Sequence, residues 1–151
     1  MAIREVFNTE EGVRGSGTQM QSFVFQVDIL ATDAINDVLF IAPLSGDLIP
    51  LTATAYTAGV TGLTDADLGF YRPERNGGAV YDADILADGI NLATSGSDDM
   101  LAAITVANRG KNFRQLSAAP LSDTELVLAL TLNTEVTANG TVFIHMTCAQ
   151  A

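Results

Sequence analysis

Two stretches near the end of the chain decide the fold: "TELVLALTLN", residues 124–133, and "TVFIHMTC", residues 141–148. In both, apolar residues recur at every second position and therefore share one face of an extended chain. The members of these faces are Leu126, Leu128, Leu130 and Leu132 in the first stretch and Val142, Ile144, Met146 and Cys148 in the second. This period is typical of half-buried β-strands. The turn residues Asn139 and Gly140 lie between the stretches, so we predict that the two strands form the last hairpin of the fold.

Five earlier segments also have the composition of short strands bounded by turns. They are "SFVFQVDIL" (22–30), "DVLFIAPL" (37–44), "LIPLTATAYT" (48–57), "DLGFYRP" (67–73) and "AVYDADIL" (79–86). Pro50 has no N–H to donate, so its strand should lie at a sheet edge or start irregularly. The last two segments flank the turn "ERNGG" and are expected to pair as a hairpin. Together the strands predict a mainly β chain, an antiparallel β-sandwich of the jelly-roll or Ig-like type.

The segment between these strands and the last pair, "SGSDDMLAAITVANRGKNFRQLSAAP" (95–120), has a different pattern. Ser97 can cap a helix, and Asp98 and Asp99 would complement its positive end. Gly110 is a plausible stop. We therefore predict a helix that begins at residue 97 and a second short helix over 112–118, which places one or two short helices before the last hairpin.

The length of 151 residues predicts one domain. Residues 1–19 are polar and glycine-rich apart from a tip that carries Ile3, Val6 and Phe7. We interpret this segment as a flexible N-terminal arm that becomes ordered against a neighbouring subunit, with a frayed terminus as the alternative. Residues 20–151 then form a single β-rich domain.

Composition excludes several classes of protein. The chain has 7 basic and 18 acidic residues and a formal net charge of -11, which argues against a nucleic-acid binder. No apolar run approaches the ~20 residues that a membrane helix needs. The N-terminal residues contain no apolar core, so we expect no secretory signal. A single cysteine excludes an internal disulfide.

No catalytic or cofactor motif is present. His145 and Cys148 are three residues apart in a predicted strand and therefore point to opposite faces. The sequence also contains no dinucleotide-binding, phosphate-loop or zinc-protease motif. We expect no enzymatic activity and no cofactor.

An acidic loop offers weak candidates for a metal site. "YDADILADG" (81–89) contains Asp82, Asp84 and Asp88, and oxygen clusters of this kind can bind calcium. Leu86, however, stands where a calcium-binding loop of the EF-hand type needs a ligand. We interpret the three aspartates as solvent-facing carboxylates and keep structural calcium as the alternative.

Three of the seven basic residues fall within "ANRGKNFRQL" (107–116): Arg109, Lys111 and Arg114. They could stabilise the C-terminus of the predicted helix. They could also form a salt-bridging patch, because arginine favours bidentate contacts with carboxylates at interfaces. The partner carboxylates would belong to a second copy or to the 82–88 loop of the same chain.

The sequence also resembles a known family. "TDADLGFYRPERNGGAVYDADILADGINLATSG" (64–96), the following "DDMLAAITVANRGKNFRQL" (98–116) and the final "GTVFIHMTCAQA" (140–151) resemble small virion structural proteins of tailed bacteriophages. The resemblance implies a non-enzymatic protein of the capsid decoration or cement type. Such a protein would be made in the host cytoplasm and would sit on the capsid exterior. Its partners would be the major capsid protein and neighbouring copies of itself, as a homo-oligomer or assembled on the particle.

Two other functions remain open at this stage. A carbohydrate- or receptor-binding β-module of a virion spike or tail would need exposed aromatic residues, for which Phe70, Tyr71 and Tyr81 are the candidates. A small hydrolase would need a histidine-based constellation, which the sequence does not offer.

Overall fold

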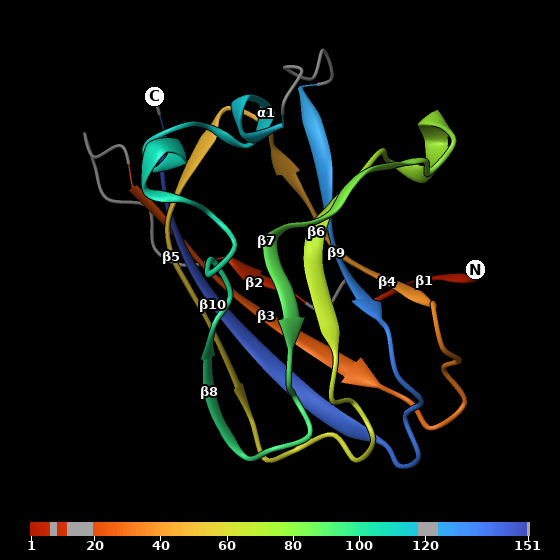
Figure 1. The fold of residues 1–151 in the computed structure, drawn as a ribbon. Helices are drawn as coiled ribbons and strands as arrows, with labels where there is room; N and C mark the ends of the chain where they lie inside the picture. The colour runs from red at the N-terminus through yellow and green to blue at the C-terminus, as the bar shows by residue number, and fades with distance from the viewer. Residues whose placement is uncertain (7–8, 12–19, 118–123, 151) are drawn as a thin grey trace.

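Ten β-strands form two sheets that pack face to face in the computed structural model, which describes residues 1–6, 9–11, 20–117 and 124–150 (Figure 1). The first sheet has the order β1-β4-β9-β6-β7 and the second the order β2-β3-β10-β5-β8. The strands are β1 (Ile3–Glu5), β2 (Thr9–Glu11), β3 (Met20–Ile29), β4 (Val38–Ser45), β5 (Leu48–Thr57), β6 (Ala66–Tyr71), β7 (Val80–Ile90), β8 (Gly96–Asp99), β9 (Glu125–Leu132) and β10 (Gly140–Gln150). Two 3-10 turns, η1 (Glu74–Asn76) and η2 (Val106–Asn108), and one short helix, α1 (Phe113–Leu116), complete the described elements.

The topology is that of a jelly roll. From β3 onward the chain changes sheet at every connection except the one between β6 and β7, which stay neighbours in the first sheet. Eight strands in two four-stranded sheets result, β3-β10-β5-β8 against β4-β9-β6-β7. β1 and β2 extend one edge of each sheet. The predicted mainly β sandwich is confirmed, and its strand order is the jelly-roll one.

The core lies between the two sheets, and α1 closes one end of it. The aromatic rings of Phe70 and Phe113 lie 4.6 Å apart between centroids, so the helix packs directly on β6. A capping box fixes where α1 begins, because the Asn112 side chain accepts from the Gln115 N–H and the Gln115 side chain accepts from the Asn112 N–H. This start places Phe113 and Leu116 inward, where both are buried. The predicted short helix near residue 112 is confirmed.

The first sheet also has an apolar outer face. Five buried residues on β4, β6 and β9 form a second hydrophobic cluster there, and the side chains of Ile3 and Ala83 pack against it. The five are Val38, Phe40, Tyr71, Val127 and Ala129. A strand that is apolar on both faces needs cover on both faces. On the outer side this cover comes in part from β1, which pairs in parallel with β4 and brings Ile3 over the sheet.

The predicted last hairpin is wrong. β9 lies between β4 and β6 in the first sheet, whereas β10 lies between β3 and β5 in the second. The residues between them cross from one sheet to the other and bond to the 58–65 connection: Asn133 N–H donates to Asp65 O at 3.0 Å and Thr137 N–H to Thr61 O at 3.0 Å. A turn dipeptide reports a local bend, but burial of both faces of β9 decides which sheet the strand joins.

The predicted helix from residue 97 is also wrong. Residues 96–99 form β8, which pairs with β5, and a turn follows in which the Asp99 carboxylate accepts from the Leu101 N–H at 2.9 Å. Met100 and Leu101 are both buried in the core. Their burial fixes this segment as an edge strand and turn, although its residue spacing also suits a helix. Only η2 is helical within the region expected for the first helix.

Other sequence expectations are confirmed. β6 and β7 form the predicted antiparallel hairpin around the 72–79 connection. Pro50 lies at an irregular position: it faces Cys148 beside a register shift in the β5–β10 pairing, and β8 pairs only with residues 54–57 further along β5. None of the helices within the described ranges is long and apolar enough to span a membrane.

Candidate interface groove on the outer face of the first sheet

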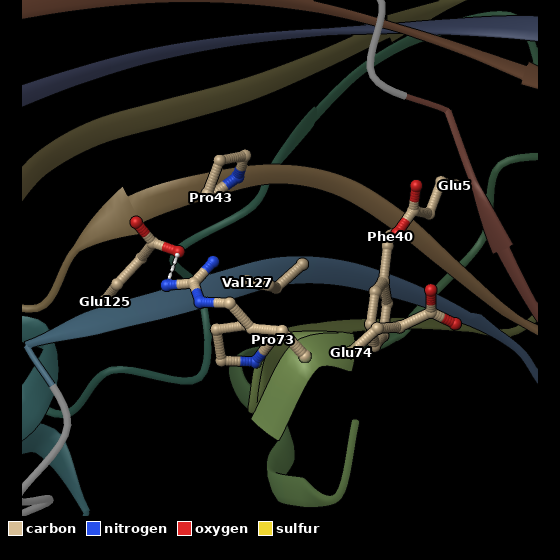
Figure 2. A pocket seen from close by; sticks show the side chains of 8 residues that line it. Glu5, Phe40, Pro43, Pro73, Glu74, Glu125 and Val127 are labelled. Carbon is tan, nitrogen blue, oxygen red and sulfur yellow. Dashed lines mark hydrogen bonds and ion pairs between the residues drawn. The ribbon is translucent and has the colours of Figure 1, made fainter. Parts of the chain in front are cut away.

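A groove of about 360 Å³ opens on the outer face of the first sheet, between the 72–79 connection and strands β4 and β9 (Figure 2). We call it the outer groove. Its lining residues come from β1, β4, the 72–79 connection and β9: Glu5, Phe40, Pro43, Pro73, Glu74, Arg75, Glu125 and Val127. Four elements from distant parts of the sequence therefore meet at one concave surface.

The 72–79 connection forms one wall of the outer groove because its glycines let it turn back over the sheet edge. Gly77 and Gly78 have φ values of 100° and 62°, which side-chain-bearing residues rarely adopt. At Gly78 a Cβ atom would lie 3.4 Å from the Cδ1 of Ile3. The connection thus approaches β1 closely and holds Pro73 and Glu74 beside the strand that carries Glu5.

The floor of the outer groove is apolar. Phe40 and Val127 belong to the second cluster, and the Phe40 ring packs at 5.5 Å from the ring of Tyr71, measured between centroids. Pro43 and Pro73 add apolar surface at the sides. Among the residues that line it there is no histidine, cysteine or hydroxyl side chain, so the outer groove lacks the groups that nucleophilic catalysis requires.

The charges of the outer groove are distributed unevenly. The Arg75 Nη2 atom lies 2.7 Å from Glu125 Oε1, an exposed ion pair at one end. Glu5 and Glu74 lie near each other toward the other end, beside the Phe40 ring (Figure 2). Desolvation raises the pKa of Glu5, and hydrogen bonding to Glu74 and the like charge of that residue raise it further. The lining carries three glutamates and one arginine, so it favours a cationic partner with an apolar portion.

The three predicted interface cations differ in their contacts within the chain. Arg114 lies in α1, and its Nη1 atom is 3.1 Å from Asp47 Oδ1 in the turn between β4 and β5. Arg109 Nη2 donates to the Leu101 carbonyl oxygen at 3.1 Å. Lys111 is exposed, and no hydrogen bond or ion pair joins its side chain to the described residues. Neither of these two contacts of Arg114 and Arg109 involves the 82–88 segment.

The N-terminal segment contributes to both faces of the first sheet. Ile3 packs on the second cluster, and Val6 packs against the main core and donates its N–H to the Phe40 carbonyl oxygen at 2.8 Å. Arg4 is fixed by an ion pair with Asp33, with 2.6 Å between Nη2 and Oδ2. The other predicted arm residue, Phe7, lies outside the described residues. A flexible arm that orders against a neighbour stays a prediction.

The acidic residues that cluster in the structure are not the same three that the sequence suggested for a metal site. Carboxylate oxygens of Asp84 and Asp88 lie within 4.8 Å of one another and of Asp67, while Asp82 lies beside Asp84. Asp67 comes from β6, and the β6–β7 pairing brings it to the cluster. The pKa of Asp88 is raised, chiefly by the charge of Asp67, and that of Asp84 chiefly by a hydrogen bond with Asp82.

The Asp67 carboxylate accepts from the Gly89 N–H at 2.9 Å and from the Asn133 side-chain amide at 2.8 Å. Asp84 and Asp88 are exposed. The arrangement suits surface carboxylates that repel one another, and a calcium site here stays a hypothesis. Asp67 lies in the acidic stretch 64–69 of the sequence, and the predicted β6–β7 hairpin brings that stretch to residues 82–88.

The aromatic candidates for a receptor site are placed unfavourably. Phe70 and Tyr71 are buried, 1 % and 3 % exposed, so neither offers a stacking surface, and Tyr81 is half-buried and packs against the main core. Within the described part of the chain, the exposed tyrosine and phenylalanine side chains are Tyr56 and Phe143, which border a second, open hollow of about 550 Å³ on the second sheet. Strand alternation predicts Tyr56 on the outward face of β5, so the sequence contained this signal.

The two residues considered for nucleophilic catalysis are also far from a reactive arrangement. The His145 ring lies 4.9 Å from that of Tyr56 on the outer face of the second sheet, whereas Cys148 is fully buried. Burial raises the pKa of the Cys148 thiol to about 12, so the reactive thiolate is suppressed at neutral pH.

The fold has counterparts among solved structures. One chain of the structure titled "Capsid of Ralstonia phage GP4" matches with a TM-score of 0.68, over 99% of this chain and 99% of that chain, at 13% sequence identity. A chain of "Cyanophage Pam1 capsid asymmetric unit" matches with a TM-score of 0.48 and 15% identity, covering 93% of this chain and 91% of that chain. The first match shows that the fold is shared from end to end. No protein-family model matches the sequence, and no curated protein matches it significantly.

Proposed function

We propose that the chain is a non-enzymatic structural protein of a phage capsid. The observation that carries this proposal is the end-to-end likeness of its fold to a chain from the Ralstonia phage GP4 capsid structure, which covers 99% of both chains. Fold alone does not specify function, so the surface must supply the rest of the argument. The outer groove is concave and apolar at its floor and lacks nucleophilic groups, which suits a protein contact better than catalysis.

Within that class we propose the decoration or cement type, which binds the capsid exterior and stabilises the shell. The sequence resemblance to small virion structural proteins supports this role. The net charge of -11 supports it as well, because mutual repulsion keeps free copies soluble until they meet a matching surface. Many copies on one shell would then stabilise it by avidity, although each contact is weak.

The residues proposed for contacts with capsid subunits or neighbouring copies are those predicted from the sequence: Ile3, Val6, Phe7, Arg109, Lys111 and Arg114. Arg109 and Lys111 are exposed, which supports a role in contacts. Arg114 is held by Asp47, so its charge reversal should also disturb the α1 end of the domain.

The test is binding to purified particles that lack this protein. We expect saturable cosedimentation with a stoichiometry set by the icosahedral shell, and particles that resist heat better once the protein is bound. A stoichiometry of about a dozen copies or fewer would point to a tail or connector role instead. Absence of binding, together with micromolar DNA affinity and a steep salt dependence, would overturn both the capsid proposal and the argument from net charge.

A second candidate function is favoured by the hollow on the second sheet. Tyr56 and Phe143 are 46 % and 40 % exposed, and Ser95 and Ser97 add hydroxyl groups beside them. Aromatic faces with adjacent hydroxyl groups suit a saccharide ligand. Glycan-array binding by the wild type that is lost in Tyr56→Ala would support a receptor-binding module over a cement protein.

A further inference from the structure

We propose that the outer groove binds the 106–111 loop of a second copy of this chain, with Lys111 entering between Glu5 and Glu74. The proposal extends the proposed function. It rests on that function only for the idea that the contact forms between neighbouring copies on a shell. The contact itself is a property of two copies of the chain and can be measured on purified protein.

The 106–111 loop has the form of an inserted segment. Val106 is 91 % exposed, the most exposed of the large apolar side chains in the described part of the chain. The loop is held in a compact turn, because the N–H of Arg109 donates to the Val106 carbonyl and that of Lys111 to the Asn108 carbonyl, both at 3.3 Å. Gly110, with φ of 90°, permits this path. The loop therefore presents one apolar side chain and two cations on a preformed turn.

The outer groove offers the complementary features. Among its apolar lining residues Pro43 is exposed, and it would contact the Val106 side chain. Its arginine is already paired with Glu125, so the adjacent Glu5 and Glu74 carboxyl groups, which interact with each other, have no cation among the lining residues to offset their charge. Two carboxylates thus face two cations, and arginine and lysine gain most from such pairs where an apolar floor excludes water.

The positions of the loop and the groove favour a contact between copies. In Figure 1, η1 beside the groove and η2 at the loop lie on opposite flanks of the same end of the sandwich. The loop therefore cannot reach the groove of its own chain. A contact between two different surfaces of identical chains is heterologous, and it closes into a ring when the rotation between copies permits.

The chain itself carries the exposed cation that the outer groove would bind. Copies with a net charge of -11 repel one another unless their contact pairs opposite charges. Lys111 is a cation without a partner among the described residues, and it lies in the same turn as the exposed Val106. The chain thus holds both halves of one complementary contact.

The experiment is sedimentation equilibrium of the full chain at low and physiological salt. We expect the wild type to self-associate, and Lys111→Glu and Glu74→Lys each to weaken association by roughly tenfold. The double variant Lys111→Glu with Glu74→Lys should recover association, because each reversed loop then meets a reversed groove. A loss in both single variants without recovery in the double variant would overturn the pairing.

Glu135→Lys is the matched control. Glu135 is exposed and lies in the crossing between β9 and β10, away from the outer groove, and the change alters net charge by the same amount as Glu74→Lys. It should leave association unchanged or strengthen it through reduced repulsion. Equal weakening by Glu135→Lys and Glu74→Lys would show a general charge effect and would contradict the proposal.

A cross-linking experiment also detects a contact that forms only on particles. The double variant Glu74→Cys with Lys111→Cys should give a ladder of disulfide-linked copies, in solution or after binding to particles, and each single variant should not. Failure to cross-link in both settings would overturn the proposal. If that variant still binds particles without cross-linking, the proposed capsid function stands and the groove has another occupant.

Discussion

β9 and β10 follow each other in the chain but are buried in different ways. Every residue of β9 from Leu126 to Leu130 is buried, on both faces of the first sheet. β10 instead alternates, with Val142, Ile144 and Met146 buried and Phe143 and His145 exposed. The second sheet therefore follows the one-sided pattern of an antiparallel sheet that faces solvent, whereas the first sheet is covered on both sides.

This difference indicates where partners are expected. The outer face of the first sheet carries apolar side chains that β1 and the 72–79 connection cover, and the outer groove lies at the margin of that cover. β9 also carries a polar atom that is buried without a partner: the Thr131 hydroxyl has no hydrogen-bond partner within the described residues. Because the chain itself covers these apolar side chains, the groove at the margin of the cover, and not the sheet face, is the surface offered to a partner.

The largest expected effect is on the core between the two sheets, into which β9 and β10 each direct one face. Leu128→Ala on β9 and Ile144→Ala on β10 remove side chains that are fully buried in the main core. Each should lower the free energy of unfolding by about 2–5 kcal/mol, from lost transfer energy and the cavity left behind. Urea denaturation measures both. A cost below ~1 kcal/mol at either position would mean that the core does not extend there.

The next largest effect should show that the outer face of the first sheet is covered and that of the second sheet is not. Val127 lies on the outer face of β9 and is 3 % exposed, whereas Val24 lies on the outer face of β3 and is half-buried. Val→Thr preserves shape and adds a hydroxyl. At Val127 it should cost about 1–2 kcal/mol, because the hydroxyl is buried without a partner. At Val24 the cost should stay within about 0.5 kcal/mol.

Equal costs at Val127 and Val24 would contradict the view that only the first sheet is covered on its outer side. The same two variants also probe assembly. If the outer groove is a contact surface, Val127→Thr should weaken association more than Val24→Thr does, since only Val127 lines the groove. Measuring both variants under conditions where each is fully folded separates that effect from stability.

The sequence predicted strands better than their partners. The alternation of apolar and polar residues located β3, β5 and β10, because one face of each strand is directed away from the core. The turn "ERNGG" identified the β6–β7 hairpin. Sheet membership was not predictable in the same way. The crossing at 133–139 depends on contacts with the 58–65 connection, which is some 70 residues earlier in the chain, as in the bond from Thr134 Oγ1 to the Gly62 carbonyl (2.8 Å, 72 residues apart).

The candidate site was predicted only in part, for a related reason. Arg109 and Lys111 were visible as a local cluster of charge, and their exposure agrees with a surface role. The outer groove was not visible, because its walls come from β1, β4, η1 and β9 and no local pattern joins them. Spacing also suggested a helix where Met100 and Leu101 are buried, so tertiary contacts overrode the local preference there.

The smallest expected effect on stability comes from a substitution in β7, the edge strand of the first sheet. Its acidic residues contrast with the apolar residues of β9. The raised pKa of Asp88, caused mainly by the charge of Asp67, means that the folded state holds this proton more tightly than the unfolded chain does. Its contribution to stability is therefore complete below the ordinary pKa of 3.8 and is lost as the pH rises through the raised value. At neutral pH the carboxylates repel one another. Asp88→Asn removes one charge and should raise the melting temperature slightly at pH 7, while at pH 3 it should change little.

Calorimetry of Asp88→Asn at both pH values, with and without EDTA, decides between repelling carboxylates and a bound ion at this edge. We expect EDTA to leave the wild-type melting temperature unchanged, because Asp84 and Asp88 are exposed and Asp67 is already bonded to the Gly89 N–H and the Asn133 amide. Calcium would reverse the sign: it would neutralise the cluster, stabilise the folded state by mass action, and make the loss of the Asp88 carboxylate destabilising. Glu135→Gln supplies the control, since it removes an exposed carboxylate outside the Asp67, Asp84 and Asp88 cluster. A lower melting temperature in Asp88→Asn but not in Glu135→Gln, together with a drop of more than ~5 °C in the wild type on adding EDTA, would show that these aspartates hold an ion.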